Sequence, residues 1–395
     1  MEKNITPKKN ISLALLVCLV GFPQISETIY TPSLMDIAVS YRITLNLAQM
    51  TISIYFLAFA LGVFFWGISS DYIGRRKAMN SGIFVYILGS LICFNSGNIT
   101  LFFIGRFIQA FGASTGSVTT QTILRDNYQG NERHQLFAKI SAALAFSPAI
   151  GPLVGGFLGQ YSGFRSVFLF LILMGVILLY WSLKNLPETK ADVQVNFVTK
   201  NILIIGKSML LDRYTVSFGI LIGIFNGILF SFHSEGPTIF METFHFNQSQ
   251  YGLIGCVVAS ATILGSWLSN RALKRTTPIF IIKNGIGVSL MGSLLLCILA
   301  LLKLPLRAQV PLYILGIFII LAGIGMSLPN CLSLALSKFS REVGTAGAIL
   351  SLGYYIIVST STFLISFFHT GSLIVFPLFC VLMLLISFVL IQLAK

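Results

Sequence analysis

Long apolar segments recur along the whole chain, and short polar segments separate them. Twelve of them approach the length of about 20 residues that a helix needs to cross the hydrocarbon core of a bilayer. The pattern therefore predicts an all-α integral membrane protein with twelve transmembrane helices. The predicted spans are residues 12–34, 47–69, 78–96, 99–122, 135–159, 164–186, 213–240, 250–270, 279–302, 311–337, 344–368 and 372–394.

Charged residues make up only 10% of the chain, against about 25% in soluble domains. The net charge of +14 would suit a nucleic-acid partner if it formed one patch, but the lysines and arginines gather in alternate loops. Because basic loops stay in the cytoplasm, we predict that both chain termini are cytoplasmic, and we expect no nucleic-acid partner. The basic residues that depart from this pattern are Arg42, Arg106, Arg165, Lys303 and Arg307.

The chain divides into two halves around its longest polar stretch. Residues 187–212 are predicted to form a cytoplasmic linker, which leaves residues 1–186 and 213–395 as two six-helix halves. An internal repeat with a shift of 199 residues supports the division. It lays Asp71 on Asn270, Arg75 on Lys274, and Arg76 on Arg275. We expect two pseudo-symmetric six-helix bundles around a central cavity, as in many secondary transporters.

Motifs of enzymes and nucleotide-binding proteins do not occur in the sequence. It has no P-loop and no H-E-x-x-H zinc motif, and its one match to G-x-S-x-G, at residues 112–116, lies within a predicted span rather than in a nucleophile turn. The six cysteines lie in or beside apolar spans without a spacing that suits metal ligation, so we interpret them as core residues. We therefore expect no enzymatic activity, no cofactor and no metal site.

Two charges lie well inside predicted spans, Glu27 in the first and Arg106 in the fourth. An isolated charge there costs from about 2.5 to more than 10 kcal/mol, so each needs a polar partner or a wet cavity. We interpret Glu27 as a proton-coupling carboxylate that Arg106 and the substrate influence as they approach or recede. The alternative is a static ion pair that braces the two helices.

Other polar residues are candidates for the lining of a central cavity. His233 and Glu235 lie near the outer end of the seventh span, where Gly236 and Pro237 can interrupt the helix. We predict that they bind a cationic group or a second proton, or else lie at the membrane interface. Further candidates, which could equally cross-link helices, are Gln24, Tyr30, Asn226, Asn330 and Tyr354.

A charged turn with glycine hinges joins the second and third spans. Its candidate gating residues are Gly67, Asp71, Gly74, Arg75 and Arg76. We predict an inner gate in which the Asp71 carboxylate is attracted by the positive end of the helix that begins near Gly344, an effect worth about 0.3–2 kcal/mol. The alternative is a purely topological anchor formed by the cations of the turn.

The same turn resembles the loop between helices 2 and 3 of the major facilitator superfamily, with the pattern Gly-x-x-x-Asp-x-x-Gly-Arg-Arg/Lys. Residues 106–113 are similar to the helix 4 motif of drug:proton antiporters. The pair Arg125-Asp126 is similar to one in the bicyclomycin-resistance (Bcr/CflA) branch of that superfamily. In that branch an acidic residue commonly lies two positions before Tyr-x-Pro in helix 1, and Glu27 lies one residue earlier than that position.

A glycine- and proline-rich segment in the fifth span resembles the helix 5 motif of antiporters. It comprises Gly151, Pro152, Gly155 and Gly156. Proline lacks a backbone donor and the glycines offer small packing surfaces, so we predict a bend at which helices approach closely. In the resembling proteins this feature is associated with export, although ordinary helix packing could require the same residues.

The resemblance and the buried charges together imply a proton-coupled secondary transporter. It would export amphipathic small molecules by alternating access, in the inner membrane of a bacterium. Its partners would be the lipid bilayer, the small-molecule substrate and protons, and we expect a monomer. The alternatives are an exporter of one siderophore or metabolite, an importer by proton symport, and a membrane receptor that does not transport.

Overall fold

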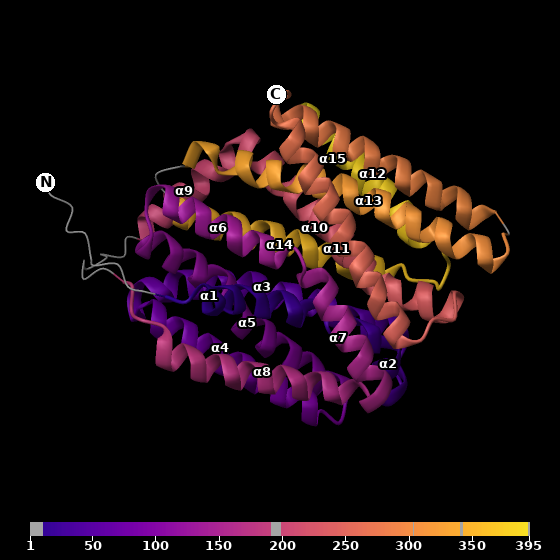
Figure 1. The fold of residues 1–395 in the computed structure, drawn as a ribbon, viewed down its shortest axis with the longest axis horizontal. Helices are drawn as coiled ribbons and strands as arrows, with labels where there is room; N and C mark the ends of the chain where they lie inside the picture. Colours follow the sequence, from indigo (N-terminus) through magenta and orange to yellow (C-terminus); the bar gives the residue numbers. More distant parts are fainter. Residues whose placement is uncertain (1–10, 191–198, 303, 340–342, 394–395) are drawn as a thin grey trace, which may run out of the picture.

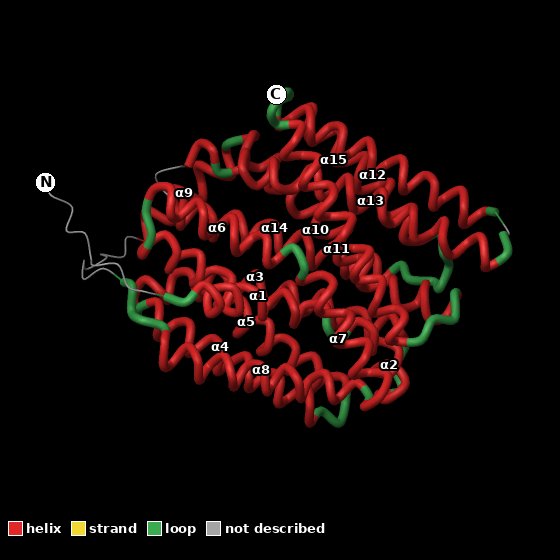
Figure 2. The backbone as a smooth tube through the Cα atoms, viewed as in Figure 1, coloured by secondary structure: helices red, strands yellow, loops and turns green. Residues whose placement is uncertain are grey.

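A computed structural model describes residues 11–190, 199–302, 304–339 and 343–393. Among these residues every regular element is a helix, and the helices run side by side along the longest dimension of the molecule (Figures 1 and 2). The expected all-α membrane fold is thus confirmed. Several basic residues used to predict the topology lie outside the described part, namely Lys3, Lys8, Lys9, Lys303, Arg341 and Lys395.

The helices of the first half run from residue 13 to residue 185. They are α1 (Leu13–Thr28), η1 (Thr31–Ser33), α2 (Leu34–Tyr41), α3 (Leu45–Ile73), α4 (Arg75–Asn95), α5 (Ile99–Asn127), α6 (Gly130–Leu144), α7 (Ser147–Ser162) and α8 (Phe164–Asn185). Two of the spans are interrupted. Proline explains the first interruption, because Pro23 and Pro32 lack the backbone donor that a continuous helix would use.

The helices of the second half run from residue 199 to residue 393. They are α9 (Thr199–Leu211), α10 (Arg213–Pro237), η2 (Thr238–Thr243), α11 (Gln248–Ala272), α12 (Pro278–Leu301), α13 (Leu306–Ala335), η3 (Ser337–Phe339), α14 (Val343–Phe367) and α15 (Val375–Leu393). Helix α9 lies in the segment expected to be a polar linker, of which residues 191–198 are outside the described part. The apolar residues between 199 and 211 give this segment a helix of its own.

Eleven helical segments in the described part are long and apolar enough to cross a membrane. Helix α5 is not among them, although it has 29 residues and packs against α3 and α4. It contains Arg106, Gln109 and a series of buried hydroxyl side chains, which lower its hydropathy. The predicted span over residues 99–122 corresponds to this polar helix.

Two hydrophobic cores lie in the two halves of the chain. The first consists of residues between Ile11 and Leu186 together with Phe230 and Val358, and the second of residues between Met209 and Ile391. The halves meet along α3 and α14 and along α7 and α11. In Figure 1, α3 and α14 run between the α4–α8 side of the molecule and the α12–α15 side. We call the end that holds the α3–α4 turn the inner end, and the opposite end the outer end.

Candidate transport cavity and gates

A central cavity of about 240 Å³ lies between the two halves. Helices α1, α7, α10, α13 and α14 contribute its walls, which combine amide, hydroxyl, aromatic and aliphatic side chains. The lining residues are Gln24, Glu27, Thr28, Ser147, Pro148, Ile222, Asn226, Leu229, Phe230, His233, Leu328, Leu332, Tyr354 and Tyr355. Of the predicted cavity residues, the structure thus brings Gln24, Asn226, His233 and Tyr354 together beside Glu27.

A second cavity of about 130 Å³ adjoins the first toward the inner end. The two cavities share Leu332 and Tyr354. The second is lined in part by polar side chains of α5, among them Gln121 and Arg125. The second cavity therefore places polar side chains between the central cavity and the inner end of the bundle.

Glu27 is buried in the wall of the central cavity, with 6% of its surface exposed. It follows Pro23 by one helical turn, just before α1 ends at Thr28. Among the described residues no cationic side chain lies within ion-pair distance of its carboxylate, although the charge of the buried Arg106 acts on it over a longer distance. The carboxylate therefore faces the cavity without an ion-pair partner among the described residues.

Arg106 is fully buried and is held by aromatic rings rather than by Glu27. Its guanidinium carbon lies 3.9 Å from the ring centre of Tyr30 and 4.3 Å from that of Tyr55, and one of its nitrogens donates to Gln109. Its Nε and Nη2 atoms have no hydrogen-bond partner in the described protein. The alternative of a static ion pair with Glu27 is therefore wrong for this conformation. Cation–π contact compensates the buried charge instead.

Three of the predicted cavity residues lie elsewhere. Tyr30 exchanges a hydrogen bond with Thr51 and packs under Arg106, outside the central cavity. Asn330 donates to the hydroxyl of Ser269 at 2.7 Å and so cross-links α13 to α11. Tyr30 and Asn330 therefore link neighbouring segments instead of lining the cavity, which is the alternative stated in the sequence analysis. A buried amide or phenol in a membrane protein needs such a polar partner.

Glu235 is the third residue that lies outside the cavity. It is 2% exposed, and both of its carboxylate oxygens lie 2.9 Å from Nδ1 of His369, in the loop after α14. The expected helix break at Gly236 and Pro237 does not occur, since α10 continues to Pro237 and passes into the π-helix η2. The chain therefore stays helical past Pro237, and its hydrogen-bond pattern changes from α to π at Thr238.

The outer end is closed by hydrogen bonds between the two halves. The amide of Asn46 on α3 donates to the backbone oxygens of Ser366 and His369 at 3.0 and 3.1 Å. One turn along α3, the amide of Gln49 donates to the backbone oxygen of Ser234 at 3.1 Å. We call these two amides the outer clamp. The outer clamp thus joins the halves at the outer end, whereas the second cavity lies on the inner side of the central one.

The glycine- and proline-rich segment lies in α7 and allows close approach of three helices. A Cβ atom on Gly155 would lie 1.6 Å from the backbone oxygen of Ile29, and one on Gly156 would lie 2.4 Å from that of Gln248. Gly151 likewise approaches the hydroxyl of Thr28. The predicted bend lies elsewhere: α7 is continuous through Pro152, and the interruption falls at residues 145–146, between α6 and α7.

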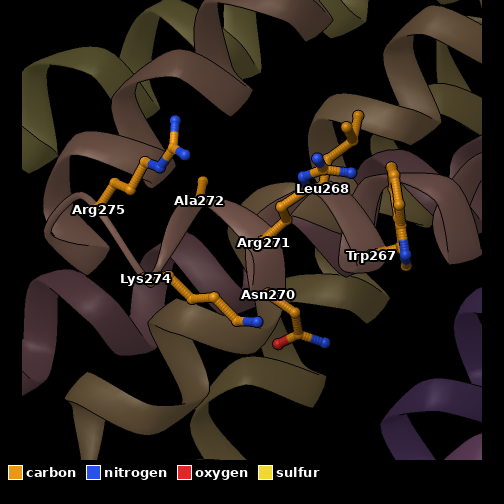
Figure 3. A pocket seen from close by; sticks show the side chains of 7 residues that line it. All are labelled: Trp267, Leu268, Asn270, Arg271, Ala272, Lys274 and Arg275. Carbon is orange, nitrogen blue, oxygen red and sulfur yellow. The ribbon is translucent and has the colours of Figure 1, made fainter.

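A separate hollow of about 780 Å³ lies at the inner end of α11 and in the turn that follows (Figure 3). Its lining residues are Trp267, Leu268, Asn270, Arg271, Ala272, Lys274 and Arg275. It contains none of the residues predicted for proton coupling or substrate binding. It does contain the second copy of the charged turn.

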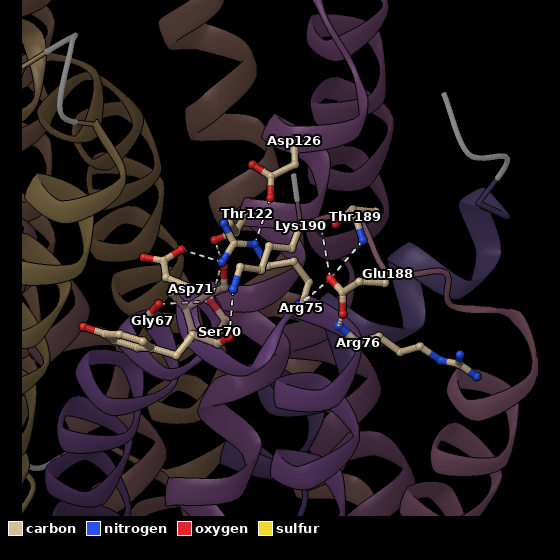
Figure 4. Close-up of polar contacts among 12 residues, drawn as sticks. Gly67, Ser70, Asp71, Arg75, Arg76, Thr122, Asp126, Glu188, Thr189 and Lys190 are labelled. Carbon is tan, nitrogen blue, oxygen red and sulfur yellow. Dashed lines mark hydrogen bonds and ion pairs between the residues drawn. The ribbon is translucent and has the colours of Figure 1, made fainter. Parts of the chain in front are cut away.

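The first copy of the turn is a closed network of charges (Figure 4). Arg75, at the start of α4, forms ion pairs with Asp71 near the end of α3 and with Asp126 on α5, whose carboxylate oxygen lies 2.8 Å from Nε of Arg75. The carboxylate of Glu188 accepts the backbone N–H groups of Arg75 and Arg76 at 2.8 and 3.2 Å. The network therefore ties the turn to α5 and to the segment after α8, within the first half.

Gly74 and Gly67 have separate roles in this turn. Gly74 has φ +95°, and a Cβ there would lie 2.4 Å from a Glu188 oxygen, so only glycine fits. Gly67 lies against α14, where a Cβ added to it would lie 3.7 Å from the Cβ of Ala348. Asp71 binds Arg75 in this conformation. Gly344, the other half of the expected latch, lies outside the residues whose side-chain surroundings are described.

Several functional side chains were not found by sequence reasoning. Tyr55, His369 and the two clamp amides lie far along the chain from the residues that they contact. Only Gln109 carried a usable signal, because it follows Arg106 by three residues and so shares its helix face. Two of the six free cysteines, Cys18 and Cys256, are exposed on the outside of the bundle rather than in the core. No group of three or more metal-binding side chains occurs in the described part.

Comparison with known proteins finds relatives over most of the chain. The sequence profile of the Major Facilitator Superfamily matches residues 16–362. An uncharacterized transporter of Rickettsia felis is 33% identical over 372 residues, which is 93% of this chain and 92% of the relative. Multidrug resistance protein D of Escherichia coli K12 is 24% identical over 381 residues, 90% of each chain. The crystal structure of a D-xylose-proton symporter has a TM-score of 0.74 at 15% identity, covering 95% of this chain and 96% of the other, a likeness of fold alone.

Proposed function

The chain belongs to the Major Facilitator Superfamily, and we propose that it is a proton-coupled antiporter that exports amphipathic small molecules by alternating access. The superfamily and the relatives named above are transporters, not enzymes. The finer assignment to the Bcr/CflA branch, with twelve spans, both termini in the cytoplasm of a bacterial cell and a monomeric state, belongs to this proposal.

One observation carries the proposal: the Glu27 carboxylate faces a cavity between the halves without a cationic partner in the described protein. A buried carboxylate is disfavoured in its charged form by desolvation and favoured in it by a nearby cation. A proton or the cationic group of a substrate can therefore satisfy Glu27, but not both at once. Mutually exclusive binding at one carboxylate is the requirement for antiport.

The rest of the cavity suits a substrate with one charge and a large apolar surface. Phe230, Tyr354 and Tyr355 supply aromatic surface, and Gln24 and Asn226 supply amide groups. The closed outer clamp and the second cavity on the inner side support loading from the cytoplasm, as export requires. The name of the Escherichia coli relative, multidrug resistance protein D, agrees with such a substrate class.

The test uses inside-out membrane vesicles with an imposed proton gradient and the lipophilic cation tetraphenylphosphonium as the probe. Wild type is expected to take the cation up into the vesicles, which corresponds to export from the cell. Glu27→Gln is expected to abolish gradient-driven uptake, and Glu27→Asp to retain part of it. The matched control is Glu132→Gln, which removes an exposed carboxylate of α6 that does not line the central cavity.

The outcomes separate the alternatives. Uptake by Glu27→Gln equal to wild type would remove Glu27 from the coupling mechanism. Transport of the probe in the opposite direction under the same gradient would indicate symport and an importer. Saturable binding of the probe without any flux would indicate a receptor.

A further inference from the structure

The second copy of the charged turn differs from the first in its electrostatics. In the first copy, the cations Arg75 and Arg76 are satisfied by carboxylates and a backbone oxygen. In the second, the position of Asp71 is taken by the neutral Asn270. Among the described residues no carboxylate lies within ion-pair distance of the cations that follow, which are Arg271, Lys274 and Arg275.

These three cations line one hollow and extend from it toward solvent. Figure 3 shows Arg271, Lys274 and Arg275 on the last turn of α11 and in the loop after it, with Asn270 beside Lys274. All three side chains are exposed. Uncompensated positive charge around a hollow of about 780 Å³ attracts an anion, and guanidinium groups suit phosphate oxygens in particular.

The apolar part of the hollow indicates where that phosphate comes from. Trp267 is 52% exposed and Leu268 is 37% exposed, and Leu264, one turn earlier on α11, is 39% exposed. The guanidinium of Arg271 lies 5.6 Å from the Trp267 ring centre. Exposed tryptophan is typical of the level of the lipid headgroups, with apolar side chains toward the acyl chains and basic side chains toward the cytoplasm.

We propose that this hollow is a binding site for the headgroup of an anionic phospholipid of the inner leaflet. The phosphate pairs with Arg271, Lys274 and Arg275, and the acyl chains lie along Trp267 and Leu268. Basic pockets on the cytoplasmic side of membrane helices recognise anionic headgroups in this way. A soluble phosphate would use the cations but not the apolar surface. The site therefore distinguishes a lipid from a free anion.

The first test restores to the second copy the carboxylate that the first copy has. Asn270→Asp places an acid four residues before Lys274, the spacing at which Asp71 pairs with Arg75. The change is nearly isosteric, so the fold is expected to be unaffected. We expect the affinity of the purified full chain for phosphatidylglycerol, measured by native mass spectrometry, to fall about fivefold.

The second test removes the charges together. The variant with Arg271→Gln, Lys274→Gln and Arg275→Gln is expected to lose at least about tenfold in phosphatidylglycerol affinity. The matched control is Lys139→Gln, Lys184→Gln and Lys207→Gln, which removes the same charge from exposed sites of α6, α8 and α9. It is expected to bind phosphatidylglycerol like wild type. Neither triple variant changes a residue that lines the central cavity. The lipid-binding result therefore does not depend on whether the proposed transport function is correct.

The remaining arms decide between a lipid site, a soluble-anion site and a general charge effect. Phosphatidylcholine is expected to bind at least about tenfold more weakly than phosphatidylglycerol, and inorganic phosphate at millimolar concentration is expected not to displace the lipid. Trp267→Ala is expected to weaken lipid binding. Any of three results would overturn the proposal. They are an equal loss of phosphatidylglycerol affinity in both triple variants, undiminished phosphatidylglycerol binding in both Asn270→Asp and the triple variant of the hollow, and displacement of the lipid by inorganic phosphate.

Discussion

Nδ1 of His369 lies 2.9 Å from both carboxylate oxygens of Glu235, and the backbone oxygen of His369 accepts the Asn46 amide from the opposite half. An ionisable pair therefore adjoins the contact that closes the outer end. His369 lies in the loop after α14, and Glu235 lies on α10. A change in protonation of the pair would be transmitted to the outer clamp through the His369 backbone.

The pair predicts a pH dependence of stability. Burial lowers the pKa of His369, but the hydrogen bond and charge of Glu235, together with the charge of Glu242, outweigh the burial and raise the pKa above its usual range. A raised folded-state pKa contributes stability that is fully present below the unfolded value of about 6.5 and is lost as the pH rises through the folded value. As the pH rises from about 6.5 through the folded-state pKa, we expect the thermal midpoint of wild type to fall relative to that of His369→Gln.

The measurement is thermal unfolding in detergent at a series of pH values from about 5.5 to 9. His245→Gln is the matched control, because His245 is an exposed histidine of the outer loop between η2 and α11. The control is expected to follow wild type throughout. A constant difference between wild type and His369→Gln across the series would contradict the protonation of this pair.

The outer clamp predicts a shift in conformation when its amides are removed. Asn46→Ala leaves two partly buried backbone oxygens without their donor, and each lost hydrogen bond is worth about 0.5–1.5 kcal/mol. We expect the outward-open population to rise by about tenfold, measured by distances between spin labels at the outer end. Asn95→Ala, at an exposed outer-end amide within α4, should leave the distances unchanged. Unchanged distances in Asn46→Ala would show that the amide does not hold the gate.

The glycines of α7 predict a large cost for a single methyl group. In Gly155→Ala the new Cβ would meet the Ile29 backbone oxygen at 1.6 Å, so α1 and α7 must move apart. We expect the free energy of unfolding to fall by about 1–3 kcal/mol, as for other overpacked sites. Gly353→Ala is the control, because no heavy atom lies within 4 Å of its Cβ position and alanine favours the helix. Equal stability of the two variants would refute the tight approach.

The charge network of the inner turn predicts a stability loss on removing its central cation. Arg75→Ala leaves Asp71 and Asp126 facing each other without a counter-charge. Since Arg75 is mostly buried and the two acids are partly exposed, we expect a loss of about 1–3 kcal/mol. Lys77→Ala, an exposed cation two residues later, should cost less than about 0.5 kcal/mol. Similar losses in the two variants would mean that the network contributes only net charge.

Membrane spans, the internal repeat and the candidate charges could be predicted from the sequence, because each depends on local information. A helix in a bilayer satisfies its own backbone hydrogen bonds, so an apolar run of sufficient length indicates a span without knowledge of its neighbours. For the same reason, Glu27 and Arg106 could be recognised as buried charges. Their partners could not be predicted, since Tyr30 reaches Arg106 from the turn after α1 and Tyr55 reaches it from α3.

The sequence by itself thus determined which segments cross the membrane and which residues carry buried charge, whereas the tertiary structure decided which of those residues meet. Glu235 contacts His369 across 134 positions of the chain, and Asn46 contacts the same loop across more than 300. Successive residues of a helix turn by about 100°, so a side chain's neighbours depend on how each helix is rotated and packed. Hydropathy along the chain does not contain that rotation.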